Sequence, residues 1–298
     1  MTVEPAPAPT GLRAWVAGAR PRTLPNSVVP VLVGTGCAAA GSHVAWSRAV
    51  LALVVSLALQ IGVNYANDYS DGVRGSDADR IGPLRLTASG VFAPRVVLAG
   101  ACIAFGVACA AGLVLAASTS WWLVLVGAAA VAAAWFYTGG SRPYGYHALG
   151  DVGVFVFFGL VAVIGTAYVA ADTPGVGWLA VLAAVPVGLL SVSVLIVNNL
   201  RDIPRDAAAG KRTLAVVLGD RATRRLYVGA LAAAALVTVG VATMHPPAAI
   251  ALLAGVLAIP PVRHVLRGDT GRDLFPTLGA TGRMQLGYGV LLTVGLFI

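Results

Sequence analysis

Two segments rich in Asp, Asn and Arg contain the residue types in this chain that could do chemistry. The first reads NYANDYSDGVRGSDADRIGP from Asn64, and the second reads NNLRDIPRDAAAGKRT from Asn198. Carboxylate and amide oxygens suit Mg²⁺, which commonly binds through one or two carboxylates while substrate phosphates complete its coordination shell. The neighbouring Arg and Lys side chains can neutralise the same phosphates. We therefore interpret the two segments as the halves of one site for Mg²⁺ and a diphosphate.

A simpler interpretation is that both segments are solvated loops in which Asp and Arg pair with each other. One segment alone would not decide between the two interpretations. Both segments, however, follow an apolar stretch, and together with a position between them they account for eight of the 12 acidic residues. These are Asp68, Asp71, Asp77, Asp79, Asp151, Asp202, Asp206 and Asp220. Because ionisable groups at membrane-embedded positions are expensive, this concentration favours a functional site.

The rest of the sequence is strongly apolar, with 58% hydrophobic and 11% charged residues and a mean hydropathy of +0.85. A soluble domain carries roughly 25% charged residues. Apolar stretches that approach the ~20 residues needed to cross a bilayer recur along the chain. We expect an all-α integral membrane protein with about nine transmembrane helices. The expected ranges are 24–41, 48–66, 95–117, 120–137, 149–170, 178–199, 226–243, 247–263 and 285–298.

The basic residues are distributed unevenly over the two sides of these helices. All of the 20 Lys and Arg residues except Arg48 fall in the tail or in connections on one side. Cytoplasmic connections carry the excess of Lys and Arg, so the N-terminus is expected in the cytoplasm and the C-terminus outside. The net charge of +8 then reflects cytoplasmic loops, and no nucleic-acid partner is expected. We expect a multi-pass protein of the cell membrane whose site faces the cytoplasm.

The domain organisation follows from the same pattern. Residues 1–10 are rich in Pro and Ala and are expected to be a disordered tail, and 11–23 reads as an interfacial helix before the first span. Residues 11–298 are expected to form a single domain. The acidic loops at 67–95 and 200–225 lie four helices apart, which suggests two pseudo-repeated halves that each contribute one loop to a shared site.

These motifs resemble a known family. The two acidic segments, together with RPRTLPNSVVPVLVG at 20–34 and YTGGSRPYGYHALGDVGVFVFFG at 137–159, are similar to the 1,4-dihydroxy-2-naphthoate polyprenyltransferases of menaquinone synthesis, which are UbiA-type intramembrane prenyltransferases. The resemblance implies helices around a central cavity and Mg²⁺-dependent ionisation of a polyprenyl diphosphate. It further implies attack by the ring of 1,4-dihydroxy-2-naphthoate with loss of its carboxylate, giving demethylmenaquinol.

The resemblance also assigns roles to individual residues, and Asp71 and Asp202 are expected to be the central catalytic acids. The expected metal ligands are Asn67, Asp68, Asp71, Asp77, Asp202 and Asp206. The expected diphosphate-binding residues are Lys211, Arg74 and Arg212. The expected acceptor-binding residues are Asn64, Tyr137, Thr138 and Arg142. Arg142 is expected to pair with the naphthoate carboxylate, and Arg20 or Arg22 at the first helix are the next candidates for this role. Against this acceptor assignment, Tyr at a membrane interface is usually an anchor and GGSRPYG has the composition of a turn.

The second segment departs from the family pattern. Pro204 and Arg205 stand where the pattern usually has Asp and Thr. On an unbroken helix Asp202 and Asp206 would share one face. Pro204 makes an unbroken helix unexpected, because proline lacks an amide hydrogen and clashes with the preceding turn. The alternative is a new helix that starts there, with Pro204 at its first position and Asp202 or Ile203 near the cap.

Three other functions deserve comparison. A UbiA-type enzyme could use another aromatic acceptor, such as 4-hydroxybenzoate. A transporter would explain acids in paired halves, but it favours charges at mid-depth, whereas these charges lie at one face. DYSDG also resembles the opening of the CDP-alcohol phosphotransferase signature, but no Asp follows Gly82 or Gly90 until Asp151, which excludes that family.

The charge asymmetry makes a prediction about topology. In a variant without native cysteines, Ser42→Cys and Thr173→Cys should react with an impermeant thiol reagent applied to intact cells. Ser76→Cys and Ala208→Cys should react only after the membrane is opened. The reverse pattern would overturn the orientation and the cytoplasmic site with it.

Overall fold

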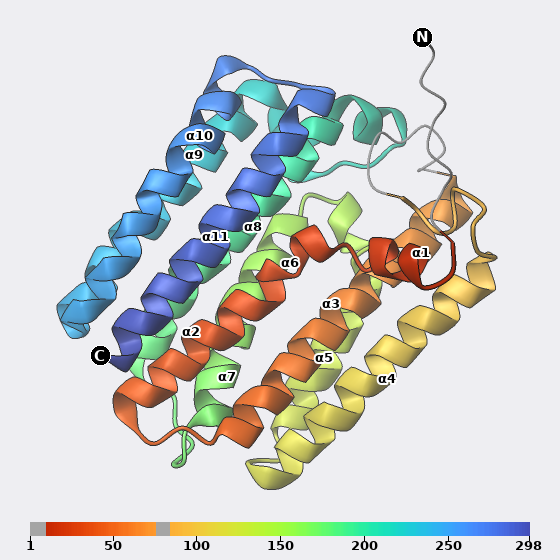
Figure 1. Ribbon diagram of the computed structural model, residues 1–298. Coiled ribbons are helices and arrows are strands. Elements are labelled where there is room, and N and C mark those ends of the chain that lie inside the picture. The colour runs from red at the N-terminus through yellow and green to blue at the C-terminus, as the bar shows by residue number, and fades with distance from the viewer. Residues whose placement is uncertain (1–9, 76–83) are drawn as a thin grey trace.

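The computed structural model describes residues 10–75 and 84–298, which form helices joined by short connections (Figure 1). The first half contains α1 (Gly11–Gly18), η1 (Pro21–Thr23), α2 (Pro25–Gly41), α3 (Trp46–Arg74), α4 (Pro94–Ser118) and α5 (Leu123–Phe136). The middle contains η2 (Tyr144–Tyr146), α6 (Gly150–Val154), the π-helical η3 (Phe155–Val161) and α7 (Ala162–Ala170). The second half contains α8 (Trp178–Ala208), α9 (Leu214–Met244), η4 (Pro246–Ala254), α10 (Gly255–Arg267), η5 (Gly271–Asp273) and α11 (Leu274–Phe297). The prediction of an all-helical protein is confirmed.

The expected membrane-spanning ranges all fall on helices. Within the described ranges, six helical segments are long and apolar enough to cross a bilayer, or seven when the bent pair formed by Gly11–Thr23 and Pro25–Gly41 is counted as one span. This pair bends by 55°. The bend separates the helix expected at the interface from the first span. Two further helices, α5 and α11, cover the remaining expected ranges.

The outer surface of the bundle is apolar. Ile103 on α4, Leu125 on α5 and Leu236 on α9 keep 69%, 74% and 73% of their surface exposed. Large exposed apolar patches mark surfaces that contact something other than water. These helices are long enough to cross a bilayer and bond their backbone groups internally, so the apolar surface is one that contacts lipid. The fold is that of a multi-pass membrane protein.

The helices form two packed groups. A large apolar core joins α2, α7, α8, α9, η4 and α11, and a second core joins α1, α3, α4 and α5. In Figure 1, α9 and α10 lie at one side of the bundle and α4 at the other, with α2 and α11 crossing the face toward the viewer. The C-terminal ends of α3 and α8, which carry the two acidic segments, reach the same end of the bundle, where Lys211 contacts Asp71.

Both acidic segments, expected in loops, lie mostly in the last turns of long helices. The α3 helix continues to Arg74, and α8 continues through Pro204 to Ala208. The expectation that Pro204 interrupts this helix is wrong. Proline costs a helix one hydrogen bond and about 3 kcal/mol in its interior, yet α8 runs from Trp178 to Ala208 with both Pro186 and Pro204 inside it, and prolines in membrane helices are tolerated where neighbouring groups satisfy the freed carbonyls. Asp202 and Asp206 therefore share one helical face after all.

Glycine permits close approach where the helices cross. A Cβ atom on Gly34 of α2 would lie 2.6 Å from the carbonyl oxygen of Val163 and 2.6 Å from Cβ of Thr166. A Cβ on Gly159 of η3 would lie 2.6 Å from Cα of Gly188 on α8. Small residues at such crossings let membrane helices pack backbone to backbone.

We predict that Gly34→Ala lowers the stability of the protein in detergent by about 1–3 kcal/mol, because overpacking forces neighbouring backbone to move. The matched control is Gly106→Ala on α4, where an added Cβ meets nothing within 4 Å. This control should be neutral or slightly stabilising, because alanine favours the helix. Thermal unfolding of both variants measures the difference, and equal melting temperatures would show that the crossing is not close-packed.

Candidate active site

A large cavity of about 920 Å³ opens within the bundle and receives residues from both acidic segments. Its volume lies at the upper end of the ~300–1,000 Å³ typical of small-molecule sites. Asn67, Asp71, Asp202, Asp206 and Lys211 line its polar end. The rest of its wall is apolar and includes Val31, Leu115, Leu123, Val126, Phe157 and Phe158. The cavity therefore joins a charged end to a long apolar chamber.

Asp71, in the last turn of α3, is buried at the centre of the polar end. Its Oδ2 lies 3.0 Å from Nζ of Lys211 and 3.6 Å from the guanidinium of Arg85. Its Oδ1 accepts a hydrogen bond of 2.6 Å from the hydroxyl of Tyr146. A buried carboxylate is tolerable only when it is paired and hydrogen-bonded. Lys211 and Arg85 supply the positive charge that makes this carboxylate tolerable.

Lys211 connects the two acidic segments. It follows Gly210, whose positive φ of 72° turns the chain back at the end of α8. Its amide donates to the carbonyl of Asp206 at 2.8 Å, while its ammonium reaches Asp71 on α3. Burial is the largest single effect and lowers the pKa of Lys211, but Asp71, Tyr146 and Asp206 together raise it by more, so that this pKa lies above its ordinary value. Lys211 is therefore a cation that both segments hold in place.

Asp202, on α8, is held by two arginines of its own helix. Arg201 donates from Nε at 2.8 Å and from Nη2 at 2.5 Å to its two carboxylate oxygens. Arg205 donates to Oδ1 at 2.9 Å. Arg201 is itself buried and stacks on Phe275 at 4.9 Å. The second segment thus presents its acid together with two fixed cations on the cavity wall.

Tyr146, in the connection between the two halves, lies between the cations of both segments. Besides its bond to Asp71, its ring faces Lys211 at 4.7 Å and Arg74 at 5.4 Å. Such cation–π contacts contribute about 0.5–2 kcal/mol each. The carbonyl of Tyr146 also accepts from the amide of Arg212 at 3.1 Å. The middle connection therefore joins the ends of α3 and α8.

Asn67 and Thr138 form a further link across the site. The Thr138 hydroxyl donates to Oδ1 of Asn67 at 2.6 Å, and both side chains are buried. Arg74 binds the carbonyls of Thr138 and Gly140. The end of α3 is thus attached to the turn after α5 by one side chain facing the cavity and one at the surface.

The structure brings most of the predicted site residues to one cavity. Those that line it are Asn64, Asn67, Asp71, Tyr137, Thr138, Asp202, Asp206 and Lys211. Four others do not line it, namely Asp68, Arg74, Arg142 and Arg212. Asp77 lies outside the described residues.

The four residues outside the cavity have different surroundings. Both carboxylate oxygens of Asp68 accept backbone amides, from Leu86 at 2.8 Å and Thr87 at 2.9 Å, so this acid anchors the returning chain. Arg74 is committed to backbone carbonyls. Arg142 and Arg212 are exposed at the surface. A molecule bound in the cavity would not contact these four side chains as they stand here.

Several cavity residues escaped the sequence analysis as site residues. They are Arg85, Tyr146, Arg201 and Arg205. Arg201 and Arg205 were visible as basic neighbours of the second acidic segment. Tyr146 gave a weaker signal, since it lies close to Tyr137 in the segment 137–159 that resembles the family. Arg85 gave none, because the turn that returns it to Asp71 depends on the Asp68 contacts.

Comparison with known proteins identifies the fold and the family. Residues 27–281 match the UbiA prenyltransferase family. The chain belongs to this family. It is 52% identical over 272 residues to a 1,4-dihydroxy-2-naphthoate octaprenyltransferase of Mycobacterium tuberculosis, covering 91% of this chain and 92% of that protein.

Solved structures of UbiA homologues share the fold. The apo homologue from Aeropyrum pernix K1 aligns with a TM-score of 0.69 at 16% identity, over 91% of this chain and 96% of that one. A homologue from Archaeoglobus fulgidus bound to GPP and Mg²⁺ aligns with a TM-score of 0.62 at 16% identity, over 94% and 99% of the two chains. The present protein is therefore a UbiA prenyltransferase, as its sequence motifs predicted.

The contrast between two adjacent basic residues gives a test of this site. Lys211→Met removes the buried cation beside Asp71 and should lower the rate of prenyl transfer by about 10²–10³, the cost of losing one preorganised electrostatic contact. Arg212→Met, at the exposed neighbouring position, should change the rate by no more than about twofold. The turnover rates of the two purified variants are compared with that of the parent enzyme. Equal losses would show that Lys211 has no special role in the site.

Proposed function

We propose that this enzyme transfers a polyprenyl group from polyprenyl diphosphate to 1,4-dihydroxy-2-naphthoate, giving demethylmenaquinol for menaquinone synthesis. The observation that carries the proposal is one shared cavity, whose charged end holds acids and cations of both segments and whose apolar chamber suits a prenyl chain. The acceptor is supported by the 52% identity over nearly the whole chain to an enzyme named for it.

The chemistry divides between the two parts of the cavity. At the charged end the allylic C–O bond breaks, and its electron pair leaves with the diphosphate. A C–C bond then forms between the allylic carbon and the electron-rich naphthoate ring, which releases its carboxylate as CO₂. The ring exchanges CO₂ for the prenyl group, so the reaction needs no oxidant or reductant. Lys211 and Arg201 would stabilise the charge that develops on the departing diphosphate.

The donor set fits Mg²⁺. Within the described ranges, no group of three or more His, Cys, Asp or Glu side chains is arranged to hold a metal ion. Mg²⁺ needs no such group, because one or two carboxylates and the substrate phosphates suffice. Asn67, Asp71, Asp202 and Asp206 offer oxygens on the cavity wall and would hold the ion together with the diphosphate. When bound, Mg²⁺ would supply positive charge to the leaving group.

The proposal places the protein in the cell membrane with the charged end of the cavity at the cytoplasmic face. The basic asymmetry of the sequence supports this orientation. The two acidic segments occupy equivalent places at the ends of α3 and α8. This equivalence supports the interpretation of residues 11–298 as two pseudo-repeated halves around one site.

We expect Asp71→Asn and Asp202→Asn to keep the fold but lower turnover by about 10²–10³, because each removes a charged ligand without changing shape. Asp172→Asn is the matched control, since Asp172 is exposed and pairs only loosely with Arg48 at 3.6 Å. It should stay within about twofold of the parent enzyme. Chelation by EDTA should abolish turnover and Mg²⁺ should restore it.

The assay itself tests the acceptor. Purified enzyme, Mg²⁺ and a polyprenyl diphosphate are incubated with either 1,4-dihydroxy-2-naphthoate or 4-hydroxybenzoate, and the products are identified by mass. Prenylation of 4-hydroxybenzoate alone would contradict the proposed acceptor. Full turnover in EDTA would contradict the metal dependence, and solute uptake without diphosphate consumption would favour a transporter.

A further inference from the structure

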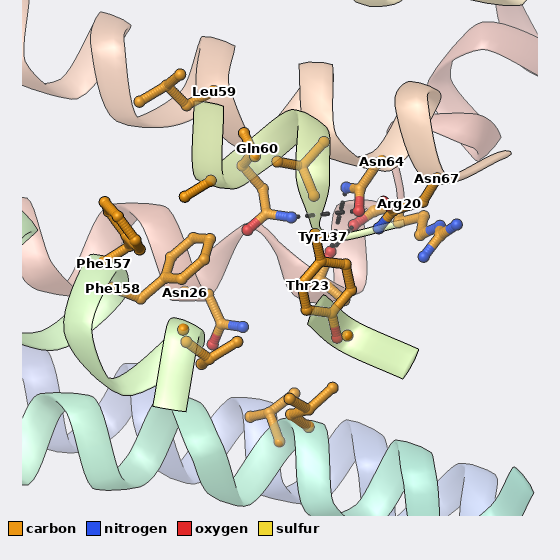
Figure 2. A pocket seen from close by; sticks show the side chains of 18 of the residues that line it. Arg20, Thr23, Asn26, Leu59, Gln60, Asn64, Asn67, Tyr137, Phe157 and Phe158 are labelled. Carbon is orange, nitrogen blue, oxygen red and sulfur yellow. Dashed lines mark hydrogen bonds between the residues drawn. The ribbon is translucent and has the colours of Figure 1, made fainter. Parts of the chain in front are cut away.

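Four exposed arginines of α9 and α10 lie outside the cavity and take no part in the proposed reaction. They are Arg221, Arg225, Arg263 and Arg267. Within the cavity, Figure 2 shows the side chains that keep a buried polar atom without a hydrogen-bond partner among the described residues, namely Arg20, Asn26 and Gln60. None of these three comes from α9 or α10. A partner of the four arginines would therefore bind on the outside of the bundle.

Each of the two helices carries two of these arginines one turn apart. Arg221 and Arg225 on α9 are separated by four positions, and so are Arg263 and Arg267 on α10. Residues four apart lie on the same face of a helix, with their Cβ atoms roughly 5–6 Å from each other. Two guanidinium groups at this spacing can bind the oxygens of one phosphate, which arginine contacts through paired N–H groups. Each helix thus presents a two-armed site for a phosphate group.

The same face of each helix is apolar and exposed on the side of the arginine pair that leads into the bundle. On α10, Val256 and Ile259 are exposed and precede Arg263 by about two turns and one turn. On α9, the exposed Leu236 follows Arg225 by about three turns. Exposed apolar faces of long helices contact lipid. The arginine pairs therefore lie where the lipid-facing surface ends.

A contact between the two helices places both arginine pairs at one level. Arg224, which lies inside the α9 pair, donates to the carbonyl of Val265, which lies inside the α10 pair, at 2.6 Å. The α9 helix begins directly after Thr213, which lines the cavity together with Lys211. The four arginines are thus at the end of the bundle that carries the charged end of the cavity. In Figure 1, α9 and α10 run together along one side of the bundle.

The acids nearby do not neutralise these four arginines. Both carboxylate oxygens of Asp220 accept from the buried Arg224 at 2.7 Å. Asp269 lies 2.7 Å from Nδ1 of His264. Over the described ranges, no salt bridge joins an acid to any of the four arginines. Two neighbouring positive charges therefore face outward from each helix.

We propose that the ends of α9 and α10 form a docking surface for anionic phospholipids, in which each arginine pair binds one lipid phosphate and the apolar face beside it contacts the acyl chains. The order of charged and apolar residues along both helices matches the order of headgroup and acyl chain in a phospholipid. A soluble acidic partner would match the charge but not the apolar faces. Each arginine near an anionic membrane surface strengthens binding about fivefold.

The experiment compares two variants that lose the same charge at different places. The first replaces the four arginines of the docking surface, as Arg221→Gln, Arg225→Gln, Arg263→Gln and Arg267→Gln. The second replaces four other exposed arginines, as Arg13→Gln, Arg95→Gln, Arg142→Gln and Arg212→Gln. Purified full-length protein in neutral detergent is titrated with fluorescent phosphatidylglycerol and, separately, with fluorescent phosphatidylcholine. The ratio of the two affinities gives the preference for an anionic headgroup.

The parent protein should prefer phosphatidylglycerol, and the first variant should lose this preference by about 10-fold or more, because two arginines are removed from each phosphate. The second variant should keep it within about twofold. Phosphatidylglycerol should also raise the melting temperature of the parent and of the second variant but not of the first, since a ligand that binds the folded state stabilises it. Where the fourfold variant does not fold, the two variants that each lose one pair should each show part of the loss.

Three results would overturn the docking surface. Equal losses in the two fourfold variants would show that total charge, and not this surface, selects the lipid. An unchanged preference in the first variant would leave its arginines to an acidic soluble partner. Displacement of the lipid probe by inorganic phosphate would show a site for free anions to which the apolar faces contribute nothing. Prenyl transfer by the first variant in neutral detergent should stay within about twofold of the parent, so the proposed function stands or fails separately.

Discussion

Charge inside a membrane protein has to be neutralised by other parts of the protein, because lipid offers no water to solvate it. In this chain the constraint acts most strongly at Asp71, a buried carboxylate at the end of α3. Its positive partner on the second half is Lys211, which lies beyond the end of α8. Because an unpaired buried carboxylate would be strongly destabilising, this contact favours the meeting of the two ends. The same pairing places both acidic segments on one cavity.

The two polar regions of the cavity differ in how fully their polar side-chain atoms are paired with other groups of the protein. At the charged end, Asp71 and Asp202 are each held by cations at hydrogen-bonding distance. Around Arg20, Asn26 and Gln60, buried polar atoms remain without partners among the described residues. A site for a metal and a diphosphate has to hold like charges before either arrives, so internal counter-charges are needed there. The atoms around Arg20, Asn26 and Gln60 include no carboxylate, so they can remain open without such counter-charges, at a cost of about 1–3 kcal/mol each.

Several individual residues could not be assigned from the sequence because their roles depend on neighbours distant in the chain. Asp68 and Asp71 are one helical turn apart and belong to the same motif, yet Asp68 binds the amides of Leu86 and Thr87 and Asp71 faces the cavity. Arg142 and Arg20 are both arginines of connections between helices, and only Arg20 lines the cavity. Pro204 predicts a break in α8, but the helix continues through it to Ala208. In each case the side chain's surroundings, and not its type, decide its role.

The sequence by itself determined the class of the protein, its helical segments and the family, because these depend on properties that are local along the chain. Runs of apolar residues long enough to cross a bilayer must be helical there, since only helices satisfy their own backbone groups in lipid. The acidic motifs are likewise contiguous and specific enough to identify a prenyltransferase. Only the tertiary structure decided which acids face the cavity, that Tyr146 and Lys211 join the two segments, and that Arg20 lies on the cavity wall. Those outcomes depend on contacts between residues far apart in sequence, where small differences in helix packing select among chemically equivalent side chains.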